Sequence, residues 1–242
     1  MAGEEKGEPR LTGWQLVAYG QLVVPLAVIG LPVAVYIPPF YSSTLGLDLA
    51  AVGLILMLAR ISDVITDPLI GRLSDRTRTR FGRRRPWVLA GVPVMMASAL
   101  MLFVPPGEVS NLYLLTWIAA IYLGYTLITI PYGAWGAELS GDYRERNRIT
   151  GSREMFLLVG LLIAISAPIA GAYWSGAPAD EGAAGRAAVG VLGWLTAIML
   201  PVCALIACSS VPEPTFHETQ SIPFRLGLRV QMKKRPSRIV LF

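Results

Sequence analysis

Six long apolar stretches, nearly free of charge, are the feature that most restricts how this chain can fold. Only 15% of the 242 residues are charged, and these are clustered, whereas a soluble domain carries roughly 25%. A helix needs about 20 apolar residues to cross a bilayer, because the hydrocarbon core is about 30 Å thick and a helix rises about 1.5 Å per residue. The stretches predict membrane-spanning helices at residues 14–41, 49–71, 86–105, 112–139, 155–174 and 187–211.

The positively charged residues lie in alternate connections between these stretches. Seven arginines follow the second stretch, four follow the fourth, and a basic segment follows the sixth, whereas the other connections hold only Arg186. Short cytoplasmic loops are enriched in Lys and Arg. We therefore expect a multi-pass protein of the cell (inner) membrane with a cytoplasmic N-terminus. The same rule accounts for the net charge of +5, so we expect membrane lipid and no nucleic acid as a partner.

These patterns divide the chain into three parts. Residues 1–13 form a cytoplasmic tail, residues 14–211 form a six-helix transmembrane bundle, and residues 212–242 form a basic cytoplasmic linker. The last residues, Ile-Val-Leu-Phe, turn apolar again. We therefore expect a seventh helix to start there.

Charged residues occur inside the second predicted span. Arg60, Asp63 and Asp67 lie in an otherwise apolar run, and charged groups within a bilayer usually face a cavity or a partner. A helix brings the Cβ atoms of Asp63 and Asp67 to about 5–6 Å on one face. Two carboxylates this close repel each other unless a cation or a proton lies between them. The spacing therefore favours a site for sodium or a proton.

A competing interpretation of the same residues stays open. The two aspartates lie near the cytoplasmic end of the span, where water could solvate them, or they could pair with Arg60. Pro68 follows Asp67 directly and frees the carbonyl of Val64, which can kink the helix or offer a further oxygen.

The fourth predicted span carries a row of polar and aromatic side chains. Tyr125, Thr129 and Tyr132 follow an i, i+4, i+7 pattern and share one helix face. Aromatic rings with polar groups suit a sugar-like solute, because the rings stack on CH groups and the hydroxyls form hydrogen bonds. An interfacial aromatic belt, or a threonine hydroxyl bonded back to its own helix, explains these residues equally well.

Two long motifs resemble those of a known transporter family. They are ARISDVITDPLIGRLSDRTRTRFGRRRPW and ITIPYGAWGAELSGDYRERNRITGSRE. Both resemble segments of the glycoside–pentoside–hexuronide:cation symporters, the melibiose-permease-like branch of the major facilitator superfamily. The resemblance implies an all-α integral membrane protein whose six transmembrane helices form the N-terminal half of a major facilitator superfamily fold.

The resemblance also implies roles for individual residues. Asp63, Asp67 and Thr126 match the family's cation site, whereas Tyr125 and Arg153 match residues near the sugar. The loop after the second helix looks like the superfamily's gating loop, in which an aspartate and an arginine latch the cytoplasmic gate. The loop residues that carry this likeness are Gly71, Asp75, Arg76, Gly82, Arg83 and Arg84. Positive charge that only sets the topology is the alternative for most of the arginines.

The chain departs from the melibiose permeases in its solute-binding positions. Thr129 stands where they have an aspartate, and residues 14–41 contain no acid to match their first-helix aspartate. The identity of the solute therefore stays open. It could be a galactoside, another sugar, a uronide or an unrelated molecule.

The favoured function is cation-coupled symport of a sugar or related solute. Because the family has two six-helix halves, we expect this chain to be the N-terminal half of a longer transporter. The alternatives are a half-transporter that needs a partner half or a second copy, and a non-transporting remnant that serves at most in interactions. An enzyme is the least favoured class, since no nucleophile–base pair, metal cluster or phosphate loop is recognisable. No cofactor is expected.

Overall fold

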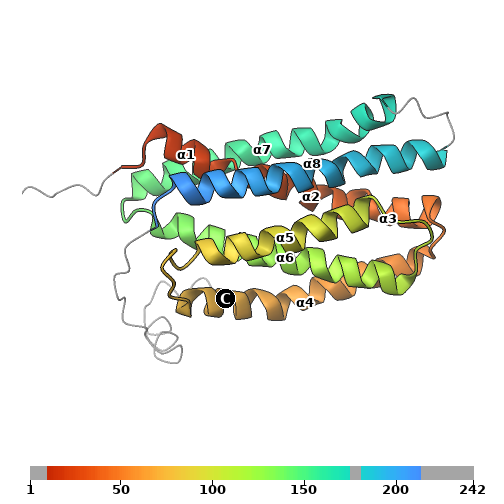
Figure 1. The fold of residues 1–242 in the computed structure, drawn as a ribbon, viewed down its shortest axis with the longest axis horizontal. Helices are drawn as coiled ribbons and strands as arrows, with labels where there is room; N and C mark the ends of the chain where they lie inside the picture. The colour runs from red at the N-terminus through yellow and green to blue at the C-terminus, as the bar shows by residue number, and fades with distance from the viewer. Residues whose placement is uncertain (1–9, 175–180, 214–242) are drawn as a thin grey trace, which may run out of the picture.

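The computed structural model describes residues 10–174 and 181–213 as a bundle of helices (Figure 1). Most of the expected cytoplasmic tail, nearly all of the basic linker and the expected start of a seventh helix lie outside these residues. The long helices are α4 (Leu49–Arg76), α5 (Arg85–Phe103), α6 (Asn111–Glu138), α7 (Tyr143–Trp174) and α8 (Glu181–Ser210). With the N-terminal pair of helices they provide six segments long and apolar enough to cross a membrane.

The first predicted span is broken rather than continuous. It consists of α1 (Gly13–Gly20), α2 (Val23–Val35), the short α3 (Ile37–Pro39) and the π-helical η1 (Phe40–Thr44). Proline supplies no backbone donor, so Pro25, Pro38 and Pro39 each leave a carbonyl of the preceding turn without its helical partner. At the first break the Gln21 side chain donates to the carbonyls of Ala18 and, 2.9 Å away on α8, Cys203.

Two helices extend beyond their predicted ends into charged sequence. α7 begins at Tyr143, where we had expected a loop up to residue 154, and α4 continues to Arg76. Asp142 starts α7, because its carboxylate accepts the Arg144 amide at 3.0 Å and its carbonyl accepts the Arg146 amide. Hydropathy detects only the part of a helix that lies in hydrocarbon, so it misses polar turns that continue outside the bilayer.

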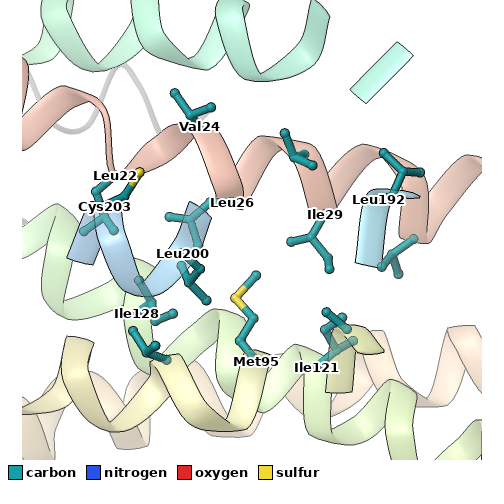
Figure 2. Packing of buried hydrophobic residues seen from close by; sticks show 14 of the residues in the cluster. Leu22, Val24, Leu26, Ile29, Met95, Ile121, Ile128, Leu192, Leu200 and Cys203 are labelled. Atoms are coloured by element: carbon teal, nitrogen blue, oxygen red, sulfur yellow. The ribbon is translucent and has the colours of Figure 1, made fainter. Parts of the chain in front are cut away.

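The helices pack around a core of aliphatic side chains. Figure 2 shows Leu26 and Ile29 of α2 meeting Met95 of α5 and Ile121 and Ile128 of α6. α5 packs against α6 and α8, and α7 packs against α2 and α8, whereas α4 packs chiefly against α6. α4 and α7 consequently lie at opposite edges of the bundle (Figure 1). Each edge helix exposes large apolar side chains, including Val64, Ile65, Met155 and Ile169.

Close contact between α7 and α2 depends on Gly160, which gives a first prediction. A β-carbon at Gly160 would lie 2.7 Å from both the Val24 carbonyl oxygen and the Ala27 Cβ. Gly160→Ala should therefore destabilise the protein by about 1–3 kcal/mol through overpacking. Gly151→Ala on the same helix is the control, because nothing lies within 4 Å of its added carbon and alanine favours a helix by about 1 kcal/mol. Thermal unfolding in detergent measures both, and equal melting temperatures would contradict the prediction.

Candidate functional site

The two aspartates of the second predicted span lie on α4 where it packs against α6. Asp63 and Asp67 are partly buried, and Thr126 of α6 is 3% exposed. The Thr126 hydroxyl donates to Asp67 Oδ1 over 2.9 Å. Because that hydroxyl uses its proton on the carboxylate, its lone pairs are free to face a cation. The structure therefore brings together the three residues that the resemblance assigned to the cation site.

One carboxylate oxygen of Asp63 is left without a donor by the residues that the structure describes. Its Oδ1 is shielded from solvent and has no hydrogen-bond partner among the described residues. Arg60 lies one turn earlier on α4, and its guanidinium stacks over the Tyr122 ring with 5.3 Å to the ring centroid. No ion pair within 4.0 Å joins Arg60 to either aspartate in the described part of the chain. The arrangement groups carboxylate and hydroxyl oxygens on two helices that are long and apolar enough to cross a membrane, and these are the ligand types that hard cations prefer.

The predicted solute face of α6 is divided in the structure. Tyr125 is 36% exposed, and its ring lies 3.7 Å from where a β-carbon on Gly30 would be. Thr129 donates its hydroxyl to the Tyr125 carbonyl at 2.8 Å, which is the back-bonded arrangement noted as an alternative. Tyr132 is 3% exposed and bonds to Tyr19 of α1, so it is buried although it shares a helix face with Tyr125.

Tyr132 is held by Tyr19 in a reciprocal pair. Each tyrosine hydroxyl donates to the other residue's carbonyl, at 2.9 and 3.0 Å, and the rings stack with centroids 4.4 Å apart. Tyrosines buried in this way fix two helices against each other, because each buried hydroxyl finds its acceptor on the other helix. Tyr132 therefore joins α6 to α1 and is not available to a solute.

Arg153 lies on α7, whereas Tyr125 and Thr129 lie on α6. It forms an ion pair with Glu154 at 2.7 Å. Together with Tyr19, Arg146 and Thr150 it lines a cavity of about 240 Å³. Among the described residues no hydrogen bond or ion pair links Arg153 to Tyr125 or Thr129. Arg153 is thus not bonded to the other two predicted solute residues within the described part of the chain.

The loop residues that resemble a gate converge on a buried arginine. Arg84 is 3% exposed and contacts Asp75 at 2.6 Å, Glu138 at 2.6 Å and the Ser74 hydroxyl at 2.8 Å. Burial alone would lower the pKa of the Arg84 guanidinium. Its bonds to Glu138 and Asp75 outweigh burial and raise that pKa above the usual arginine value, so Arg84 stays charged. The cluster joins the ends of α4 and α6 to the start of α5.

The other predicted loop residues surround this cluster. Arg83 pairs with Glu138 at 2.5 Å, Gly82 adopts φ +102°, and Gly71 lies beside Ile130 of α6. Arg76 ends α4 as an exposed residue.

Sequence reasoning gave no role to Glu138 or Glu213, which bind this loop from α6 and from the end of α8. The available signal was charge complementarity, because each is an acid at a helix end opposite an arginine-rich loop.

Comparison with known proteins identifies the family. Residues 18–242 match the family described as MFS/sugar transport protein. The chain belongs to this family. The uncharacterized symporter YnaJ of Bacillus subtilis is 35% identical over 73% of this chain and 38% of its own length. The isoprimeverose transporter of Lactiplantibacillus pentosus is 27% identical over 87% of this chain and 44% of its own length.

The inner membrane symporter YicJ of Escherichia coli is 33% identical over 53% of this chain and 28% of its own length. The chain thus spans less than half the length of these relatives. All three are named as transporters rather than enzymes. The membership and the six apolar helices identify a multi-pass membrane protein with an all-α, MFS-type half.

Proposed function

We propose that this chain forms the cation-binding half of a symporter that couples sodium or proton entry to uptake of a sugar or related solute. The observation that carries the proposal is the hydrogen bond from Thr126 to Asp67, one turn from the unpartnered oxygen of Asp63. The names of the relatives support a symporter, and the isoprimeverose transporter supports a sugar-like solute.

The physical basis of coupling is the charge of the aspartate pair. Two carboxylates on one helix face repel each other, and a bound sodium ion or proton relieves that repulsion. The bound ion is a co-substrate, driven inward by its gradient and by the membrane potential, which is worth about 2.3 kcal/mol per charge per 100 mV. The solute binds towards Tyr125, Thr129 and Arg153. The cluster around Arg84 acts as the latch of a gate that opens as the carrier changes the side it faces.

The exposed edges of the bundle support a second helical unit as partner. Within the most apolar window of each span, the buried share is 17% in α4 and 28% in α7, whereas it is 72% in the first span. A second six-helix unit packed on these edges would complete the solute site between the two units. Because basic connections stay inside, we place the Arg84 end of the bundle in the cytoplasm and the protein in the inner cell membrane.

Cation binding is testable on this chain alone, because Asp63, Asp67 and Thr126 all belong to it. The purified chain in detergent is heated in sodium chloride and in choline chloride of equal ionic strength, across a range of pH. An ion present at a concentration 100 times its Kd should stabilise the fold by about 2.7 kcal/mol. Sodium coupling predicts stabilisation by sodium at neutral pH, and proton coupling predicts stability that rises as pH falls. Melting temperatures that follow neither ion would count against the site.

A further inference from the structure

The carboxylate of Glu213, just after α8, is bound by the backbone at the start of α5. Its Oε1 accepts the amide of Arg83 at 2.5 Å and the amide of Arg84 at 2.6 Å. Its Oε2 forms an ion pair with Arg85 Nε at 3.4 Å, without the geometry of a hydrogen bond. Arg83 and Arg84 immediately precede α5, and successive backbone amides that point to one place form a concavity suited to an anion.

Gly82 makes room for this carboxylate. Its amide donates to the Thr79 carbonyl at 3.0 Å, and its φ of +102° is a conformation that other residues rarely adopt. A β-carbon at Gly82 would collide with the Glu213 carboxylate. The glycine therefore serves both the turn and the close approach of Glu213.

The two residues before Glu213 are held at the same place. Arg85 donates to the Val211 carbonyl at 2.5 Å, and the Trp135 indole of α6 donates to the Pro212 carbonyl at 3.0 Å. The Arg85 guanidinium also lies over the Trp135 ring, 5.7 Å from its centroid. Three consecutive residues after α8 are thus attached to the loop between α4 and α5, to the first residue of α5 and to the end of α6.

Two acids hold this loop in different ways. Glu138 binds the side chains of Arg83 and Arg84, whereas Glu213 binds their backbone amides. A side-chain contact lets the backbone of the loop shift while the long arginines stay engaged. A carboxylate on the amides fixes the backbone itself.

We propose that Glu213 latches the segment leaving α8 to the gating loop, so that the two move together when the gate opens. Glu213 is a positioning residue, since it acts through the amides of Arg83 and Arg84. The consequence for transport rests on the proposed role of the loop as a gate. The latch itself is a physical contact that can be measured without any transport.

Amide hydrogen exchange tests the latch on the purified chain. In Glu213→Ala the amides of Arg83 and Arg84 should exchange at least about tenfold faster, because they lose a charge-assisted bond. Glu213→Gln keeps an uncharged acceptor and should show an intermediate rate. Glu138→Gln is the matched control, because it weakens contacts to the same arginines but leaves their amides bound. Unchanged protection of both amides in Glu213→Ala would overturn the latch.

A double-mutant cycle with Gly82 distinguishes loss of the Glu213 contact from general unfolding of the Glu213→Ala variant. Gly82→Ala should lower the melting temperature more than Gly46→Ala, a second positive-φ glycine with φ +77° and nothing within 4 Å. In a Glu213→Ala background the effect of Gly82→Ala should shrink to that of Gly46→Ala, because the colliding carboxylate is gone. An equal effect of Gly82→Ala in both backgrounds would refute the contact. If neither sodium nor protons stabilised the unmodified chain but the cycle gave the expected coupling, only the proposed function would be refuted.

Discussion

Asp67→Asn is expected to abolish the stabilisation of the chain by its coupling ion. Asparagine keeps the shape of aspartate and an oxygen that can accept the Thr126 hydroxyl, which donates to Asp67 at 2.9 Å. It removes one of the two negative charges that attract the ion. The gain of about 2.7 kcal/mol expected at 100 times Kd should therefore disappear, while the ion-free melting temperature stays the same or rises as repulsion from Asp63 ends.

Two matched variants separate this effect from a general change in charge. Glu108→Gln also removes one negative charge, but at an exposed loop position, and it should leave the ion response intact. Thr126→Val keeps both carboxylates and removes the hydroxyl that we propose as a ligand, so binding should weaken without disappearing. If Asp67→Asn and Glu108→Gln responded to the ion alike, the cation would bind elsewhere.

Arg84→Ala is expected to cause the largest loss of stability among the loop variants. The arginine is 3% exposed and joins Asp75, Glu138 and Ser74. Removing one partner of a buried ion pair costs about 3–5 kcal/mol. We expect about 3 kcal/mol, the lower end of that range, because Asp75 and Glu138 keep access to water. Chemical or thermal unfolding in detergent gives the measurement.

Charge alone does not explain the expected effect, and two further variants test this. Arg84→Lys keeps the charge but loses the forked geometry that reaches two carboxylates at once, so it should fall between alanine and the unmodified chain. Arg72→Ala removes an exposed arginine near the end of α4 and should change stability by less than about 0.5 kcal/mol. Equal losses in Arg84→Ala and Arg72→Ala would show that the cluster contributes nothing specific.

The sequence predicted the number and place of the apolar spans because hydrocarbon thickness sets a length that hydropathy detects. It did not predict the break at Gln21, although Pro25 was visible, because the break also depends on the Cys203 carbonyl of α8 accepting the glutamine amide. The start of α7 at Tyr143 was missed for a local reason rather than a tertiary one. Its first turns are charged and leave no apolar signal.

The aspartate pair followed from local geometry, since four residues on a helix bring two side chains together. Its contact with Thr126 did not, because the relative position of α4 and α6 is a tertiary property, and only the family resemblance suggested it. Tyr132 shows the limit of helical periodicity. Tyr125 and Tyr132 share a face of α6, but α1 covers that face only at Tyr132. Glu138 and Glu213 likewise gained partners that lie far away in sequence.

Solute accumulation in membrane vesicles tests the central claim, that ion entry through the Asp63–Asp67 site drives uptake. Vesicles containing the chain together with the second helical unit that we propose receive labelled xylose, methyl glucoside or glucuronate, with an imposed inward sodium gradient, proton gradient or neither. We expect at least one solute to accumulate above equilibrium under one of the two gradients, and an Asp63→Asn, Asp67→Asn double variant to abolish that accumulation. Equal accumulation by the double variant, or accumulation that needs neither gradient, would contradict the account.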